Sequence, residues 1–283
     1  MTWVEVSVTV ERERADAVAG IFFEMGSGVL WEEPAPALVT VKGYFPAGAG
    51  VDRQVADLRR SLAAVLESEP GVGVRQVREE DWAHAWRRHY RPFRVGKRFV
   101  VRPPWEEYPG FPDDLVIVLD PGMAFGCGTH PTTQMCLAML EEAVRPGMRV
   151  CDVGTGSGIL AIAAALLGAG RVEAVDNDPT AVRVARKNVE ANGLAGKIDV
   201  RQGYLLDAVE GPLDLVVANI TADVILRLVP AAARVLAPGG VFIAGGIIRD
   251  RMPEVIKAVA GAGWRRLRTE ERGEWAMLAG VTA

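Results

Sequence analysis

The sequence has few cysteines and histidines and no long apolar run. Its 283 residues contain only Cys127, Cys136 and Cys151 and three histidines, and their spacing does not match a metal-binding pattern. We therefore expect a reducing, cytoplasmic location and no metal. No apolar run approaches the roughly 20 residues of a membrane-spanning helix, and the N-terminal residues alternate like a strand, so neither membrane insertion nor secretion is expected.

The sequence also lacks a large excess of charge of either sign. The formal net charge is −4, which gives no general reason to expect a nucleic-acid partner. The local exception is a basic segment, Arg87 to Arg102, which contains seven Lys and Arg residues and no acidic residue and follows Trp82 and Trp86. This segment is either a solvated connector or a surface that contacts RNA or an acidic protein.

The most informative segment is a glycine-rich turn between two apolar runs. Residues 150–153 read as a buried strand and residues 159–167 as a helix. The turn between them contains Gly154, Gly156 and Gly158. Glycine allows the backbone to approach a ligand closely. Asp176 follows the next strand, residues 171–175, at the distance where a βαβ unit brings a carboxylate to a ribose diol, so an adenosine cofactor is indicated.

The spacing of the glycines distinguishes between cofactors. Ile159 occupies the position where a dinucleotide fingerprint requires glycine, which disfavours a dinucleotide-dependent oxidoreductase. No Lys-Ser/Thr pair follows, which excludes a P-loop, and Thr155 stands where a nucleophile elbow at Ser157 would need glycine. Gly-x-Gly-x-Gly after Asp152 resembles the first motif of Rossmann-like S-adenosylmethionine-dependent methyltransferases. A purely structural turn is the alternative.

Periodicity divides the chain into three parts. Residues 1–80 read as βαββαβ, a small ferredoxin-like α+β domain suited to recognising a substrate. Residues 81–102 are the connector, with a helix and the basic segment. Residues 103–283 alternate strands and helices as a doubly wound, mostly parallel sheet requires, and residues 274–281 are expected to be its closing edge strand.

Two further segments resemble one family. Asp-Pro-Gly-Met-Ala-Phe-Gly-Cys-Gly-Thr-His-Pro-Thr-Thr begins at Asp120, and Ala-Asn-Ile occupies residues 218–220. Together with the connector, they resemble the ribosomal protein L-eleven methyltransferase family along almost the full chain. The resemblance implies a class I methyltransferase domain and an N-terminal domain that recognises large-subunit ribosomal protein L-eleven. It also implies transfer of methyl groups from S-adenosyl-L-methionine to lysine side chains and the N-terminal amine.

The same resemblance implies a set of cofactor contacts. They fall on Thr133, Gly154, Asp176 and Asn219, and the glycine motif adds Gly156. Phe125 is either a wall against the cofactor or target chain, or an ordinary core residue. Cys127 stands where threonine is expected, and a small side chain is kept. Residues 220–222 lack the Pro-Pro-aromatic sequence that many methyltransferases use to hold a planar nitrogen, in agreement with a flexible alkyl amine as substrate.

The expected reaction is in-line attack of a neutral amine on the sulfonium methyl group. His130 is the nearest candidate for a general base, but fixing its loop by a hydrogen bond is the favoured role, so no catalytic acid or base is assigned. Two alternatives are a methyltransferase for the lysines of another protein and a ribosome-associated cofactor-binding factor without turnover. A monomer is expected.

Overall fold

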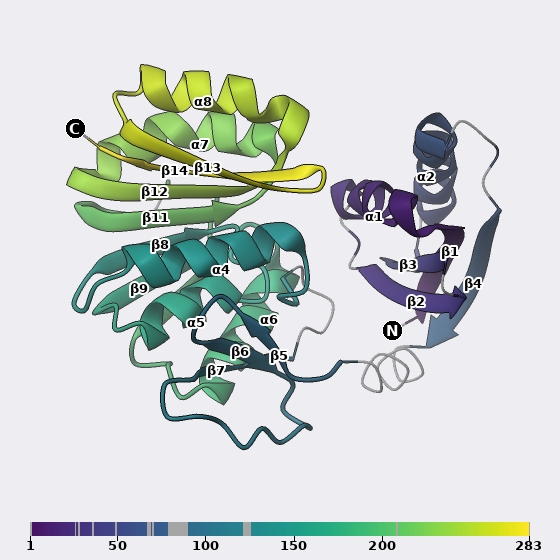
Figure 1. The fold of residues 1–283 in the computed structure, drawn as a ribbon, viewed down its shortest axis with the longest axis horizontal. Helices are drawn as coiled ribbons and strands as arrows, with labels where there is room; N and C mark the ends of the chain where they lie inside the picture. Colours follow the sequence, from purple (N-terminus) through teal and green to yellow (C-terminus); the bar gives the residue numbers. More distant parts are fainter. Residues whose placement is uncertain are drawn as a thin grey trace. The chain divides into compact units, whose positions relative to one another are not determined.

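The computed structural model describes residues 2–25, 27, 29–35, 37–48, 50–66, 69, 71–78, 90–120, 126–207 and 209–282. The chain forms two compact units, Met1–Tyr90 and Arg91–Ala283, and each is described by itself (Figure 1). The second unit begins at Arg91, so it includes residues 91–102 that the sequence assigned to the connector. Within this range, Phe93–Val95 and Phe99–Arg102 form strands, and the apolar side chains of Phe99, Val100 and Val101 are buried.

The first unit is a four-stranded antiparallel sheet with two helices. Its elements are β1 (Thr2–Glu11), η1 (Arg12–Arg14), α1 (Ala15–Glu24), β2 (Val29–Ala35), β3 (Leu38–Pro46), α2 (Val51–Leu66) and β4 (Val72–Arg78). The strand order is β2-β3-β1-β4, and every neighbouring pair is antiparallel. Val6 and Val8 of β1 pack with Leu58 and Leu62 of α2, so alternation in β1 directs one face of the sheet toward the helices. The predicted ferredoxin-like order is confirmed.

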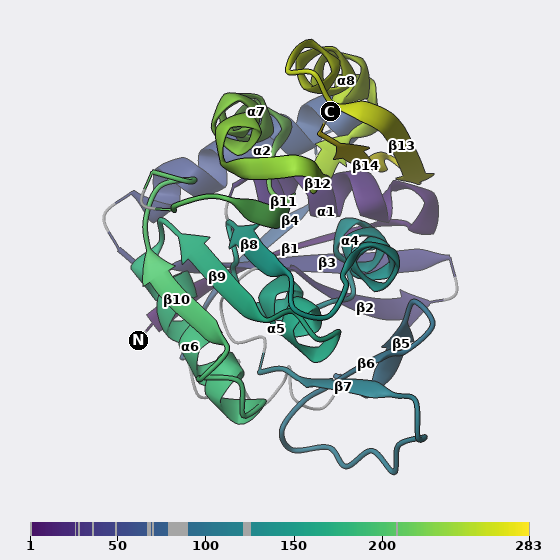
Figure 2. The same cartoon turned by 90° about the vertical axis from the view of Figure 1, so that its left-hand side faces the viewer.

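The second unit is built on a seven-stranded sheet of order β10-β9-β8-β11-β12-β14-β13 (Figure 2). Its strands are β8 (Arg149–Val153), β9 (Arg171–Asp176), β10 (Ile198–Gln202), β11 (Leu213–Asn219), β12 (Leu236–Ile248), β13 (Arg265–Arg272) and β14 (Trp275–Val281). Strands β8 to β12 pair in parallel, and β14 is antiparallel to both of its neighbours. The predicted doubly wound, mostly parallel sheet is confirmed.

Helices cover both faces of this sheet. They are α4 (Pro131–Ala143), α5 (Ile159–Leu166), α6 (Pro179–Ala191), α7 (Ala222–Val235) and α8 (Met252–Gly261), with η2 (Arg249–Arg251) before α8. Cys151 and Val153 of β8 pack in one cluster with α7 and α8, whereas Asp152 between them accepts a hydrogen bond from the start of α5. Successive strand residues point to opposite faces, so α5 lies across the sheet from α7 and α8 (Figure 2).

The prediction that residues 274–281 form the edge strand is wrong. This segment, β14, lies between β12 and β13, and β13 forms the edge. The physical reason lies in the side chains: those of β14 from Trp275 to Ala279 are all buried, whereas β13 has the polar sequence Arg-Arg-Leu-Arg-Thr-Glu-Glu-Arg. A charged strand is suited to an edge because it disfavours pairing with other chains.

The second unit also contains a smaller, three-stranded sheet. Its strands are β5 (Phe93–Val95), β6 (Phe99–Arg102) and β7 (Leu115–Val118), in the order β5-β6-β7. Glu141 of α4 holds the β5–β6 turn, because its carboxylate accepts hydrogen bonds from the backbone N–H groups of Lys97, Arg98 and Phe99. Asn192, which follows α6, holds the free edge of β7: its side chain accepts a hydrogen bond from the N–H of Val118 and donates one to the Val118 carbonyl.

No helix in the described part of the chain is long and apolar enough to cross a membrane.

Candidate functional site

The glycine-rich turn joins the carboxyl end of β8 to α5. The N–H groups of Gly154 and Thr155 both donate to the carbonyl of Val175 in β9, at 2.8 and 3.0 Å. Gly154 has a φ of +71°, and a Cβ at this position would collide with the Ile220 side chain. Glycine is therefore required both by the backbone conformation and by the close approach of the segment after β11.

Asp176 ties this turn to the start of α6. Its Oδ2 accepts a hydrogen bond from the Gly156 N–H at 2.9 Å, and its Oδ1 accepts one from the Asp178 N–H at 2.9 Å. A carboxylate has about four acceptor positions, so both oxygens can accept further bonds from a ligand. The side chain is thus fixed in orientation by the protein while it remains able to bind a pair of hydroxyl groups.

Asn219 and Thr133 meet at the end of β11. The Asn219 amide donates to the Thr133 hydroxyl at 3.1 Å, and both side chains are buried. Among the described residues, the Asn219 Oδ1 finds no hydrogen-bond partner. Gly245 lies alongside, where a Cβ would stand 3.0 Å from that oxygen. A buried acceptor without a partner in the protein is a position where a ligand donor would be favourable.

Asp152 is a residue to which the sequence reasoning gave no role. It is fully buried, and its Oδ2 accepts bonds from the Thr155 hydroxyl at 2.6 Å and the Ala161 N–H at 3.1 Å, while its Oδ1 has no partner among the described residues. Burial raises the pKa of Asp152 to about 7, and the negative charge of Asp176 adds to the shift. The available signal was an acidic residue inside the apolar run Val-Cys-Asp-Val.

His130 begins α4 and orients its first turn. It is the N-cap residue, and its Nδ1 accepts a hydrogen bond from the Thr132 N–H at 3.3 Å. Its ring packs edge-on against Trp275 with the centroids 4.7 Å apart, and burial lowers its pKa to about 4. A neutral, packed, capping imidazole agrees with the favoured role of fixing the loop by hydrogen bonding.

The predicted cofactor residues that the structure describes lie near the carboxyl ends of the parallel strands. Two hydrogen-bonded pairs, Gly156 with Asp176 and Thr133 with Asn219, lie at the ends of β9 and β11, the strands that flank β8. Ligands of open α/β sheets bind beyond the carboxyl ends of the strands, at the point where the strand order reverses, as it does here at β8. Phe125 lies outside the described residues.

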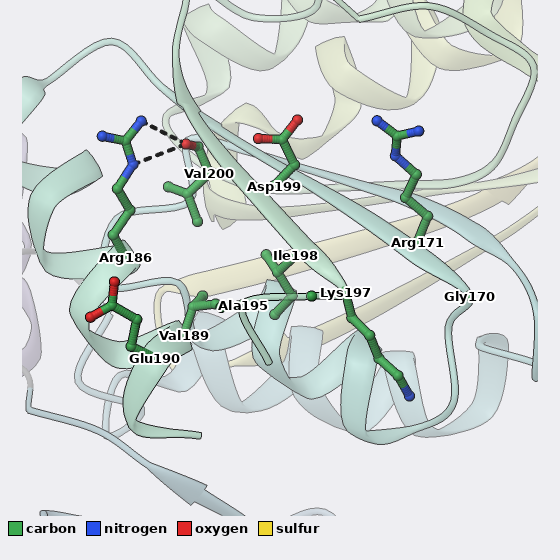
Figure 3. A pocket seen from close by; sticks show the side chains of 11 residues that line it. Gly170, Arg171, Arg186, Val189, Glu190, Ala195, Lys197, Ile198, Asp199 and Val200 are labelled. Atoms are coloured by element: carbon green, nitrogen blue, oxygen red, sulfur yellow. Dashed lines mark hydrogen bonds between the residues drawn. The ribbon is translucent and has the colours of Figure 1, made fainter. Parts of the chain in front are cut away.

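A surface cavity of about 670 Å³ lies elsewhere, at the amino ends of β9 and β10 (Figure 3). Arg186 at its wall donates two hydrogen bonds to the Val200 carbonyl, while Arg171 and Lys197 point apart (Figure 3). The cations therefore do not converge on a common point. In the described part of the chain, no group of three His, Cys, Asp and Glu side chains is arranged to hold a metal ion.

The arginines in the described part of the basic segment have partners within the chain. Arg91 forms an ion pair with Glu106, and Arg94 forms one with Asp114 at 2.7 Å. Arg98 and Arg102 donate to backbone carbonyls of the acidic stretch that joins β6 to β7. Two of the five positive charges in residues 91–102 are thus balanced by ion pairs, which favours a structural role for Arg91 and Arg94. Trp82, Trp86 and Arg87 lie outside the described residues.

The fold and the site together define a class I methyltransferase: a sheet in this order, a glycine turn after β8 and a carboxylate at the end of β9. The family model of ribosomal protein L11 methyltransferase (PrmA) matches residues 2–283, so the chain belongs to this family.

Individual relatives agree with this assignment. The ribosomal protein L11 methyltransferase of Pelotomaculum thermopropionicum is 49% identical, with 99% of this chain and 98% of the relative covered. The protein of the same name from Heliobacterium modesticaldum is 43% identical, with 100% and 99% covered. The crystal structure of ribosomal protein L11 methylase from Lactobacillus delbrueckii subsp. bulgaricus has a TM-score of 0.64 and 38% identity, covering 69% of this chain and 100% of that chain.

Proposed function

We propose that this protein transfers methyl groups from S-adenosyl-L-methionine to amino groups of ribosomal protein L11, at lysine side chains and at the N-terminus. The observation that carries the proposal is the Asp176 carboxylate, held by the glycine turn at the end of β9 in a chain that matches the family from end to end. The names of the relatives support the choice of L11 as the substrate.

The described residues are suited to this cofactor. Asp176 has acceptor positions for both ribose hydroxyls, and Gly154 and Gly156 would allow the backbone to come close to the ligand. Asn219 contributes a buried acceptor without a partner among the described residues, fixed by its bond to Thr133. The bound cofactor would supply the electrophilic methyl group, and these side chains would hold it at a fixed position and orientation.

The amine has to lose its proton before it can attack. A lysine with a pKa of ~10.4 needs roughly 4.6 kcal/mol for this at pH 7, whereas an α-amino group near ~7.8 needs about 1 kcal/mol. Burial beside a positive sulfonium lowers either pKa. We assign no general base, because the His130 ring caps α4 and packs against Trp275. The protein's main contributions are therefore alignment and exclusion of water.

The first unit is the proposed site of L11 recognition, and the second unit is the proposed site of methyl transfer. Contact of the basic segment with RNA stays a prediction, and the ion pairs of Arg91 and Arg94 argue against a large contribution from these two residues. Binding of a short RNA to the wild-type protein at low salt would test that prediction directly, since phosphate contacts weaken as salt rises.

The test of the proposed function is mass spectrometry of unmethylated L11 incubated with this protein and S-adenosylmethionine. Mass gains in steps of one methylene are expected, and fragmentation of the product would identify the amines. Asp176→Ala should reduce the affinity for S-adenosylmethionine by about tenfold or more, because charge-assisted hydrogen bonds contribute about 1.5–3 kcal/mol each. Cofactor binding without any mass gain of L11 would contradict the proposal. It would favour either a methyltransferase for another protein or a cofactor-binding factor without turnover.

A further inference from the structure

Ser157 stands at a junction of three parts of the proposed cofactor site. It lies in the glycine turn and is fully buried. Its hydroxyl donates to the Gly126 carbonyl at 2.7 Å, at the start of the stretch that leads into α4 and Thr133. Its own carbonyl accepts a hydrogen bond from the Asn188 side chain of α6 at 2.8 Å. One residue thus connects the turn to α4 and to α6.

Asn188 is held in a defined orientation. Its Oδ1 accepts a hydrogen bond from the Asp120 N–H at 3.0 Å, so its Nδ2 is the group that faces Ser157. Asn188 is 1% exposed, and the hydrogen bonds of both side-chain ends are made to backbone groups far away in the sequence. Buried polar groups that are fully hydrogen-bonded rigidify the segments they join.

The close packing of glycines around the turn supports the connection that Ser157 makes between segments. A Cβ on Gly158 would lie 3.3 Å from the Ala185 Cβ, so α6 approaches the turn closely one helical turn before Asn188. A Cβ on Gly126 would lie 2.8 Å from the Ser157 hydroxyl. Glycine at both positions lets the three segments come near enough for the two hydrogen bonds of Ser157 to form.

We propose that Ser157 and Asn188 are positioning residues for methyl transfer: they fix the glycine turn against α4 and α6, and thereby set the spacing between Thr133, Gly156 and Asp176. Neither residue needs to touch the cofactor. The proposal rests on the proposed function, because it assumes that the cofactor binds at these three residues. It predicts that the two hydrogen bonds of Ser157 influence cofactor affinity more than comparable buried hydrogen bonds nearby.

Asn192, the C-cap residue that follows α6, offers a control about one helical turn beyond Asn188, at a partly buried position. Its Oδ1 accepts from the Val118 N–H at 2.9 Å and its Nδ2 donates to the Val118 carbonyl at 2.7 Å, so it anchors β7 as Asn188 anchors the turn. Asn188→Asp and Asn192→Asp each keep the acceptor, remove the donor and add one negative charge. They differ in the hydrogen bonds that are lost: the Asn188 Nδ2 donates to the glycine turn, whereas the Asn192 Nδ2 donates to the Val118 carbonyl of β7 and to the Asn188 carbonyl, each at 2.7 Å.

The experiment measures the Kd of S-adenosylhomocysteine by calorimetry, together with the melting temperature, for both variants of the full chain. Asn188→Asp is expected to raise the Kd by about tenfold, the effect of one buried carbonyl left without its donor, and Asn192→Asp by less than about twofold. Equal changes in Kd at equal loss of melting temperature would overturn the proposal. Should Asn188→Asp fail to fold, Ser157→Ala is the second variant, with the same expected rise in Kd.

The two proposals fail in different ways. A wild-type protein that binds the cofactor analogue but does not methylate L11 would contradict the proposed function and leave the comparison of Kd values intact. Methylation of L11 by a wild type whose Ser157→Ala variant binds the cofactor analogue normally would contradict the positioning role alone. The double variant Ser157→Ala with Asn188→Asp should change the Kd by less than the two single changes combined, because the two lost hydrogen bonds hold the same turn in place.

Discussion

Asp152 and His130 are buried titratable residues whose pKa values are shifted in opposite directions. Burial raises the pKa of Asp152 from 3.8 to about 7, so between these values the folded chain binds a proton that the unfolded chain releases. Burial lowers the pKa of His130 from 6.5 to about 4, so between these values the unfolded chain binds a proton that the folded chain releases. The first group contributes stability that is lost as pH rises, and the second contributes stability that is lost as pH falls.

Asp152→Asn is expected to gain stability relative to the wild type as pH rises from about 4 to 7, by up to about 4 kcal/mol. Asparagine keeps an acceptor for Thr155 and Ala161 and has no charge to bury. His130→Asn keeps an N-cap acceptor and should show the opposite trend, gaining relative to the wild type as pH falls from 6.5 to about 4. Urea unfolding at a series of pH values measures both. If stability depended on pH in the same way for the wild type and both variants, the shifted pKa values of Asp152 and His130 would be contradicted.

At the scale of elements, Glu141 is the link between α4 and the β5–β6 turn. Its carboxylate accepts three backbone hydrogen bonds, and Gly96 in that turn has a φ of +63° and no room for a Cβ beside the Glu141 oxygens. The backbone N–H groups of the turn therefore surround the Glu141 carboxylate. Its three N–H groups would lose their common acceptor without the carboxylate.

Glu141→Gln is expected to destabilise the second unit by about 1–3 kcal/mol, because the amide turns an N–H₂ toward backbone donors. Glu142→Gln is the matched control: it removes an exposed ion pair with Arg268 and should change stability by less than about 0.5 kcal/mol. The urea midpoints of the two variants give the comparison. A change of similar size in both would mean that the Glu141 carboxylate does not organise the turn.

Local patterns predicted the elements better than their arrangement. The βαββαβ order of the first unit, the strand before Gly154 and the strand that ends at Asp176 could be found from alternation, apolar runs and glycine spacing. The neighbours of β14 could not, because its apolar sequence Trp-Ala-Met-Leu-Ala-Gly-Val indicates burial but does not identify which strands pair with it. Sheet order depends on which strand edges remain for pairing, and that is a property of the assembled sheet.

In the proposed cofactor site, too, local features could be predicted from the sequence, whereas contacts between distant segments could not. Gly154, Gly156 and Asp176 belong to one βαβ unit, so their spacing in sequence predicts their proximity in space. Thr133 and Asn219 are hydrogen-bonded although 86 positions separate them, and only the resemblance to a family brought them into the predicted site. The buried role of Asp152 depends on burial by α5 and on Thr155, which a linear pattern does not reveal.

At the scale of the whole molecule, the two units have separate hydrophobic cores. Leu58 of α2 belongs to the core of the first unit, and Leu228 of α7 belongs to the core of the second. Both side chains are fully buried. Each unit thus has its own source of stability, and a ligand that binds one unit should stabilise that unit alone.

Leu58→Ala is expected to destabilise the first unit by about 2–5 kcal/mol and to leave the cofactor affinity of the second within twofold of the wild type. Leu228→Ala should instead lower the thermal transition that S-adenosylmethionine raises. Calorimetric scans with and without the cofactor distinguish the two transitions. A single transition that both substitutions lower equally would show that the units unfold together.

The position of β14 has a consequence for how the protein is made. This strand is synthesised after β12 and β13, yet it lies between them and pairs with both. During translation the parallel strands β8 to β12 can assemble first, while β13 has to wait for a partner that is not yet present. In a chain released before Trp275, β12 would become an open edge and β13 would lack the strand with which it pairs. We therefore expect such prematurely terminated chains to be removed by aggregation or proteolysis rather than to persist as weaker enzymes.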